Sequence, residues 1–185
     1  DMCMIDHLED LMAAGVDCLK IEGRAKSAYY AAIVTGAYRH CLDAVAAGEP
    51  LDPVWRDEVE HISHRHYSTG FYYPEHKVRQ STDRSAYFRA WLVVGEVLSW
   101  SPEDGGRVTI MSRNKIEAGQ EVEFVLPGAA PFAYTVPAGG FRDADGHWVE
   151  AINNPAHVFS MPCPQEVPVN AAIRSRTKKP TLKAE

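Results

Sequence analysis

Cysteine is scarce in this sequence, and long apolar runs are missing. The four cysteines show no CxxC or other tight ligand spacing, which argues against a disulfide framework and favours reduced thiols in a cytoplasmic protein; they are Cys3, Cys18, Cys41 and Cys163. We expect Cys18 and Cys41 at core positions. No apolar run reaches the roughly 18 residues of a membrane span, so no membrane partner is predicted.

A basic excess and the common hydrolase motifs are also missing. The net charge of −6 argues against a protein that binds nucleic acids indiscriminately through a basic surface, although an acidic protein can still have a local basic face. There is no GxSxG, no HExxH, and no Cys–His pair with a persuasive local context. The spacing of His61, His64 and His66, with His76 nearby, does not fit a metal site, so none is predicted.

Residues 1–48 show the pattern helix, strand, helix. Apolar residues from Ile5 to Met12 predict a short helix ending at Gly15, and residues 16–21 predict a strand covered on both faces. Eight apolar positions from Tyr30 to Val45 recur at helical spacing, with Ser27 as N-cap and Gly48 as the stop. Because one strand cannot make a parallel sheet, we expect a remnant of an α/β, TIM-like barrel within a longer protein.

The loop between this strand and helix carries four charges in seven residues. Such loops lie at the carboxyl ends of barrel strands, where ligands bind. We therefore predict that Arg24 and Lys26 hold a carboxylate or phosphate, while Glu22 orients one of them or accepts a proton. The alternative is a structural ion pair between Glu22 and Arg24. Lys20 is a candidate only if it points into the barrel mouth.

Two later regions are rich in positive charge. The first mixes it with aromatic residues, and the second is a run of basic residues near the end of the chain. Residues 64–91 contain five Arg or Lys interleaved with seven Tyr, Phe or Trp, and the end of the chain is basic from Arg174 onward. Cations bind phosphates and aromatic rings stack on bases, so both regions are candidates for RNA contact. The alternative is that the aromatics form a core and that the tail is simply solvated.

From about residue 92 the pattern changes to two-residue alternation with frequent turns. The expected strands are residues 92–100, 107–113, 121–126, 132–136, 147–152, 158–161 and 169–175. Six or seven short antiparallel strands predict a small closed β-barrel. The fold class is therefore α+β, with a barrel remnant at 1–48, a helical and extended linker at 49–90, a β-barrel at 91–176 and a basic tail at 177–185.

Three segments resemble the C-terminal half of peptidase family U32. They are Asp1-Met2-Cys3-Met4-Ile5, then Leu19-Lys20-Ile21-Glu22-Gly23-Arg24 continuing to Tyr30, and His64-Arg65-x-Tyr67-x-x-Gly70-Phe71. The spacing is most similar to the branch that hydroxylates tRNA. The resemblance implies a β-barrel like domain two of translation factors, and a parent protein with an iron-sulfur cluster whose cysteines precede residue 1.

The same resemblance implies partners and further site residues. It implies prephenate as a substrate of the parent, tRNA or rRNA as a partner, and the preceding barrel portion as a second partner. From the family motif together with the basic, aromatic composition of residues 64–91, the expected RNA-binding residues are His64, Arg65, Tyr67, Phe71, Arg79 and Arg84.

Three functions follow from these observations. The first is support of prephenate-dependent hydroxylation of a tRNA wobble uridine. The second is a collagenase-like peptidase, and the only support for it is the name of the family. The third is a noncatalytic module that binds RNA or protein. We expect the parent to be an RNA hydroxylase, and this chain alone to be inactive and to bind no cofactor.

Overall fold

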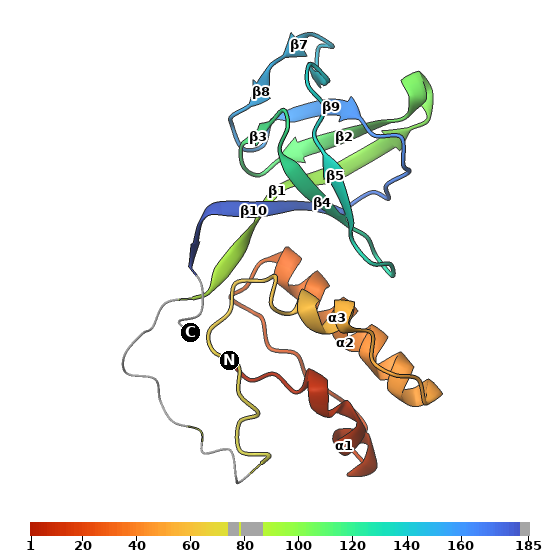
Figure 1. Ribbon diagram of the computed structural model, residues 1–185, viewed down its shortest axis with the longest axis vertical. Helices are drawn as coiled ribbons and strands as arrows, with labels where there is room; N and C mark the ends of the chain where they lie inside the picture. Colours follow the sequence, from red (N-terminus) through yellow and green to blue (C-terminus); the bar gives the residue numbers. More distant parts are fainter. Residues whose placement is uncertain (74–77, 79–86, 182–185) are drawn as a thin grey trace. The chain divides into compact units, whose positions relative to one another are not determined.

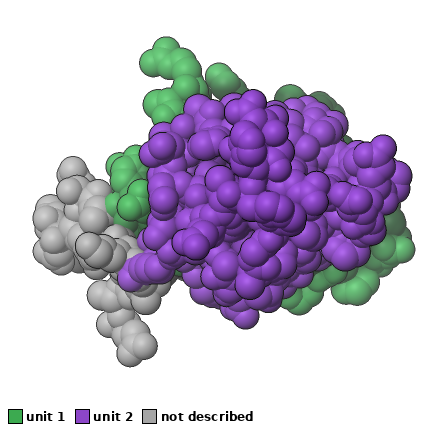
Figure 2. Space-filling model, turned by 90° about the horizontal axis from the view of Figure 1, so that it is seen from above, with its two compact units in different colours: residues 1–90, 179–185 green, residues 91–178 purple. Residues whose placement is uncertain are grey.

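The computed structural model describes residues 1–73, 78 and 87–181. The chain forms two compact units, which Figure 2 colours separately. Unit 1 comprises residues 1–90 with 179–185, and unit 2 comprises residues 91–178. None of the helices in the described ranges is long and apolar enough to span a membrane.

Unit 1 is helical and is built around α2 (Ala28–Ala47). The Ser27 hydroxyl accepts a hydrogen bond from the backbone N–H of Tyr30 at 3.2 Å, and Gly48 ends the helix with φ +71°. This confirms the predicted cap and stop. The remaining helices are the 3-10 turn η1 (Ile5–His7), α1 (Leu8–Ala13) and α3 (Pro53–Glu58) (Figure 1).

The core of unit 1 joins the helices to the start of the chain. Leu8 and Leu11 of α1 pack with Ala37 and Cys41 of α2 and with Val59 after α3. Residues 1–3 run parallel to residues 66–68 and form a single β-bridge between Met2 and Ser68. The family motif at residue 64 onward is therefore held against the first residues of the chain by backbone hydrogen bonds.

The predicted strand at residues 16–21 is absent from the structure, which corrects that expectation. This segment has no regular secondary structure and pairs with no strand in the described part of the chain. Val16 and Ile21 are 41% and 38% exposed, and Cys18 is exposed instead of buried. A strand needs a neighbour for its backbone groups. The TIM-like barrel interpretation of residues 1–48 therefore stays a prediction.

Unit 2 is an antiparallel β structure. Its larger sheet has eight strands in the order β5-β4-β10-β1-β2-β9-β6-β7, and β3 pairs with β8 (Figure 1). A 3-10 turn, η2 (Glu103–Gly105), lies between the first two strands. The strands are β1 (Arg89–Ser101), β2 (Arg107–Ser112), β3 (Ile116–Glu117), β4 (Glu121–Val125), β5 (Phe132–Thr135), β6 (Phe141–Asp143), β7 (Trp148–Val149), β8 (Ala151–Ile152), β9 (Val158–Pro162) and β10 (Ala172–Thr181).

The large sheet curls into a half-barrel and does not close as predicted. Among the described strands, β5 and β7 are its two edges and do not pair with each other. The curl is held from inside by fully buried side chains such as Ile110, Phe124 and Phe159. The Tyr134 hydroxyl on β5 donates a hydrogen bond to the Pro162 carbonyl on β9 at 2.6 Å. A side-chain contact thus replaces the backbone ladder that would close a barrel.

Most of the predicted strands are present, with changes at three places. Residues 147–152 divide into β7 and β8, which join different sheets. Sequence reasoning missed β3 and β6, which have only two and three residues. The last strand continues to Thr181, so residues 177–181 belong to β10 and not to a separate tail.

Candidate anion-binding site

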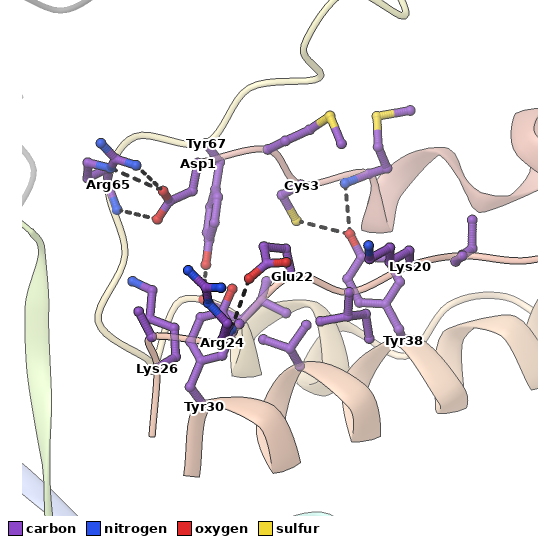
Figure 3. A pocket seen from close by; sticks show the side chains of 18 of the residues that line it. Asp1, Cys3, Lys20, Glu22, Arg24, Lys26, Tyr30, Tyr38, Arg65 and Tyr67 are labelled. Atoms are coloured by element: carbon purple, nitrogen blue, oxygen red, sulfur yellow. Dashed lines mark hydrogen bonds and ion pairs between the residues drawn. The ribbon is translucent and has the colours of Figure 1, made fainter. Parts of the chain in front are cut away.

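Unit 1 contains a cavity of about 750 Å³ beside the first turn of α2. Its walls come from residues 1–4, the 16–26 segment, and residues of the motif at 64–71 (Figure 3). The structure thus brings together all three segments that carry the family resemblance. Glu22, Arg24 and Lys26, predicted as one site, all line this cavity.

The loop at residues 22–26 is a tight turn stabilised by its own groups. The Glu22 carboxylate accepts a hydrogen bond from the backbone N–H of Arg24 at 2.9 Å, and the Lys26 N–H donates to the Gly23 carbonyl at 2.8 Å. A Cβ at position 23 would lie 3.0 Å from Cε1 of Tyr30. A larger residue here would therefore need a small shift of the Tyr30 ring, which packs against the loop.

The lining of the cavity carries a net positive charge. Four cations and two carboxylates line it, a difference of +2; they are Lys20, Arg24, Lys26 and Arg65, and Asp1 and Glu22. An anion in the cavity would therefore meet favourable electrostatics.

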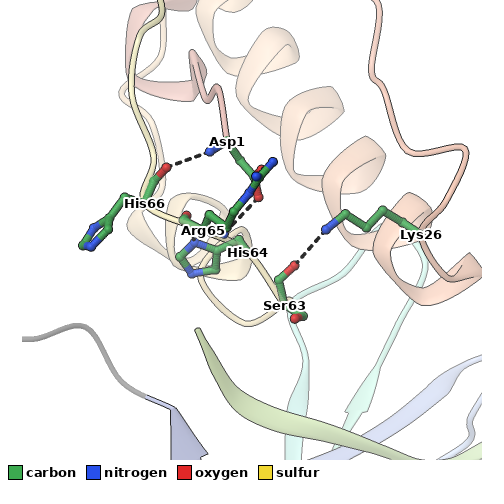
Figure 4. A network of polar contacts seen from close by, with 6 residues as sticks. All are labelled: Asp1, Lys26, Ser63, His64, Arg65 and His66. Carbon is green, nitrogen blue, oxygen red and sulfur yellow. Dashed lines mark hydrogen bonds and ion pairs between the residues drawn. The ribbon is translucent and has the colours of Figure 1, made fainter. Parts of the chain in front are cut away.

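Arg65 is held by an acidic partner. The Asp1 carboxylate accepts hydrogen bonds from the Arg65 backbone N–H at 2.9 Å and from Nε at 3.1 Å (Figure 4). Arg65 Nη2 lies 3.0 Å from the same carboxylate. The Asp1 backbone nitrogen also donates to the His66 carbonyl at 2.7 Å. Asp1 therefore pairs with Arg65, whose side chain nevertheless remains 57% exposed.

Lys26 points away from the loop toward aromatic rings and a carbonyl. Its ammonium lies 4.3 Å from the centre of the Tyr87 ring and 5.3 Å from that of Tyr30. It also donates to the Ser63 carbonyl at 3.5 Å (Figure 4). These cation–π and hydrogen-bond contacts tie the loop to the segment just before the motif.

Arg24 and Lys20 differ from these two cations. Both are exposed, and neither side chain has a hydrogen-bond or ion-pair partner within residues 1–73, 78 and 87–181. In particular, the Glu22 carboxylate bonds the backbone of Arg24 and forms no ion pair with its guanidinium. This observation disfavours the alternative of a structural Glu22–Arg24 pair. Figure 3 shows the two cations on either side of Glu22.

Tyrosines contribute much of the cavity lining; Tyr30, Tyr38 and Tyr67 are three of the five that line it. Burial raises the pKa of Tyr38 and Tyr67 far above the ordinary value, and it also raises the pKa of Tyr30. Tyr67 donates to the Val59 carbonyl at 2.5 Å, and Tyr38 accepts from the Met4 N–H at 2.8 Å. Their hydroxyls stay protonated at neutral pH, so they can donate hydrogen bonds but cannot act as bases.

The predicted RNA-binding residues are placed in different environments. His64 is 2% exposed, and its ring stacks on Tyr67 with ring centres 4.2 Å apart. Its two ring nitrogens lie 2.7 Å from the Arg65 carbonyl and 3.2 Å from the Glu60 carboxylate. It lies in the interior, contrary to the surface position that base stacking needs. Arg65 is exposed and Phe71 is 92% exposed. Arg79 and Arg84 lie outside the described residues.

The second basic region also differs from expectation at its first member. Arg174 is 1% exposed and donates two hydrogen bonds to the Glu123 carboxylate, at 2.9 and 2.7 Å. Its guanidinium lies 4.8 Å from the centre of the Trp91 ring. Arg174 is therefore a core residue of unit 2, whereas Arg176 is exposed.

Neither the histidines nor the cysteines form a metal centre in the described residues. His61 lies 3.1 Å from Glu58. Asp143, Asp145 and His147 do cluster, but Asp143 there accepts the backbone N–H groups of Asp145 and His147, which is the bonding of a turn. All four cysteines are free; Cys3 and Cys18 line the cavity, and Cys41 and Cys163 are buried.

Comparisons with known proteins agree with the motifs. The pattern of peptidase family U32 matches residues 1–82, and that of the peptidase family U32 C-terminal domain matches residues 89–174. tRNA hydroxylation protein P1 of Bacillus subtilis is 31% identical over 166 residues, 85% of this chain. tRNA hydroxylation protein P of Haemophilus influenzae is 31% identical over 185 residues, 95% of this chain.

The chain spans 38% of the length of each of these two relatives. Among solved structures, the C-terminal domain of a U32 protein from Geobacillus thermoleovorans is 26% identical, with a TM-score of 0.42; the match covers 45% of this chain and 99% of that one. The two sequence patterns together account for nearly all of the chain. The chain belongs to peptidase family U32.

Proposed function

We propose that this chain is the part of a tRNA-modifying protein that binds an anionic cosubstrate of hydroxylation. The relatives named for tRNA hydroxylation support the reaction class. The observation that carries the proposal is the Arg24 guanidinium, which has no partner among the described residues and lines a cavity with net positive charge. We propose prephenate as the cosubstrate and a wobble uridine as the target, as the family resemblance implies.

The chemistry of the cavity suits a carboxylate ligand. A guanidinium binds a carboxylate through two parallel hydrogen bonds, which are about twice as strong as neutral ones. Tyr30 lines the same wall, and its hydroxyl has no hydrogen-bond partner in the described part of the chain, so it offers another donor. The apolar faces of Tyr38 and Tyr67 would cover the ring of an aromatic or cyclohexadiene carboxylate.

This chain does not contain a complete iron-sulfur site. A cluster needs four ligands, commonly cysteine thiolates, and only Cys3 and Cys18 line the cavity. No cysteine belongs to a group of three possible metal ligands in the described residues. We therefore propose that the cluster implied by the family is completed by residues outside this chain, and we assign no step to it.

The exposed segment at residues 16–21 is the proposed contact with the rest of the barrel. Val16 and Ile21 are large, exposed apolar side chains, and residues 16–21 pair with no strand in the described part of the chain. Both properties suit a segment that forms a β-strand when another strand pairs with it. We propose that a preceding barrel portion pairs with this segment and completes the cavity.

RNA is the second proposed partner. Arg65 and Phe71 in unit 1 and Arg176 in unit 2 are exposed, and they provide a cation, a ring and a cation for a nucleic acid. The test is binding of the chain to unmodified tRNA at several salt concentrations. Log affinity should fall steeply with log salt, because each phosphate contact releases counterions. No binding at low salt would leave only an interaction with protein.

The test of the cosubstrate site uses Arg24→Ala in the complete protein. Cells lacking the endogenous protein are complemented with wild type, Arg24→Ala or Arg39→Ala, and hydroxylated uridine is measured in tRNA by mass spectrometry. Arg39 is a matched control because it is exposed on α2 and pairs only with Asp43 in the described residues. We expect loss of the modification with Arg24→Ala alone. Normal modification in that variant would refute the proposal.

A further inference from the structure

The four cations of the cavity are not equivalent, because two of them have internal partners. Arg65 forms an ion pair with Asp1, and Lys26 lies against the Tyr87 and Tyr30 rings and the Ser63 carbonyl. A ligand that bound either of them would compete with these contacts. Binding to Arg24 or Lys20 breaks no contact in the described residues.

The internal contacts of Lys26 and Arg65 converge on one place. Arg65 lies 5.5 Å from the centre of the Tyr87 ring, on which Lys26 also lies. Asp1, Arg65, Tyr87 and Lys26 thus connect the first residue, the family motif and the 22–26 loop. This arrangement ties the 22–26 loop, which carries Arg24, to the family motif.

We infer that Arg24 and Lys20 contact the ligand, and that Lys26 and Arg65 are positioning residues for the loop. This inference rests on the proposed function and assigns its binding residues. It changes the prediction from sequence, in which Arg24 and Lys26 were the ligand pair. It also adds Lys20, which was a candidate from sequence only if its side chain pointed into the barrel mouth.

The arrangement selects a class of ligand. Arg24 and Lys20 lie on either side of Glu22 (Figure 3), so two anionic groups of one small molecule can each meet a cation. The Glu22 carboxylate between them repels a negative charge but accepts a hydrogen bond from a hydroxyl. The site therefore fits a dianion better than a single carboxylate.

The test compares four variants of the complete protein with two probes. Lys20→Met, Arg24→Met, Lys26→Met and the control Arg39→Met are each titrated calorimetrically with prephenate, a dianion, and with phenylpyruvate, a monoanion. Thermal unfolding is measured for each variant. Methionine keeps the aliphatic stem of the side chain, so the variants differ from wild type mainly in charge.

Each variant has a distinct expected result. Arg24→Met should weaken binding of both probes about tenfold or more, as expected for the loss of a charge-assisted hydrogen bond. Lys20→Met should weaken prephenate binding only. Neither should change the unfolding midpoint. Lys26→Met should lower the midpoint by about 1–4 °C through the lost cation–π contact. In a fifth variant, Lys26→Arg, the cation is retained and the midpoint should stay close to that of wild type.

The outcomes separate this inference from the proposed function. If Lys26→Met weakens prephenate binding as much as Arg24→Met with an unchanged midpoint, Lys26 contacts the ligand and the assignment is wrong. If Lys20→Met weakens both probes equally, the two-anion arrangement is wrong. If the wild-type protein binds neither probe, the proposed cosubstrate site itself fails, and this inference fails with it.

Discussion

Replacing Arg174 with methionine should destabilise unit 2 by about 3 kcal/mol. Arg174 is 1% exposed and donates two hydrogen bonds to Glu123. Removing one partner of a buried ion pair costs about 3–5 kcal/mol. Glu123 keeps 27% of its side chain exposed, so water can solvate the remaining carboxylate and lowers this to about 2–3 kcal/mol. The lost contact with Trp91 adds about 0.5–1 kcal/mol.

The assay is unfolding followed by tryptophan fluorescence. Three of the four tryptophans, Trp91, Trp100 and Trp148, belong to unit 2, so the signal reports mainly on this unit. At about 2–4 °C per kcal/mol for a chain of this size, the midpoint should fall by about 6–12 °C.

An exposed ion pair in the same unit provides the control. Arg113 lies 2.7 Å from Glu96, and the two side chains are 48% and 33% exposed. Arg113→Met should cost less than about 1 kcal/mol. If Arg174→Met unfolds at the same midpoint as Arg113→Met, the buried pair does not hold the half-barrel as we argue.

Two further predictions concern unit 1 and the thiols. Ser27→Ala removes the cap that accepts the Tyr30 N–H and should cost about 1 kcal/mol, measured by urea unfolding; an unchanged midpoint would contradict the cap. Cys18 should react fast with a maleimide, whereas burial raises the pKa of Cys41 and Cys163 and slows both. The protonated buried thiols favour the fold at neutral pH, and this contribution is lost as pH rises through the raised pKa values. Equal labelling of all four cysteines near pH 7 would contradict this placement.

The helices could be predicted from sequence because their signals are local. The α2 helix needs only apolar residues at helical spacing, a serine at its start and a glycine at its end, and all three are visible in the chain. The long strands of unit 2 were predictable for the same reason, since alternation and turn residues mark them. The two- and three-residue strands β3 and β6 are too short to show any period.

The failures have non-local causes. The segment at residues 16–21 has the composition of a strand, but a strand forms only where another chain segment pairs with it. Arg174 looked like the first cation of a basic tail because its partner, Glu123, is 51 residues away. Closure of a sheet depends on how far it curls, and no local pattern records that.

The candidate site was predicted in part. The charged loop and the motif at residue 64 were recognised, but their meeting around one cavity depends on the contact of Asp1 with Arg65 and of Lys26 with Ser63. The same contacts explain why Lys26, which carries the same charge as Lys20, is bound internally. Sequence alone gives the charges of such residues and not their partners.

The central claim is that an anionic ligand binds Arg24 in the cavity of unit 1. The most direct test is a crystal structure of the complete protein soaked with prephenate. We predict density in the cavity, with one carboxylate about 3 Å from the Arg24 guanidinium and the second beside Lys20. An empty cavity with prephenate bound elsewhere, or a carboxylate on Lys26 with Arg24 turned to solvent, would contradict the claim.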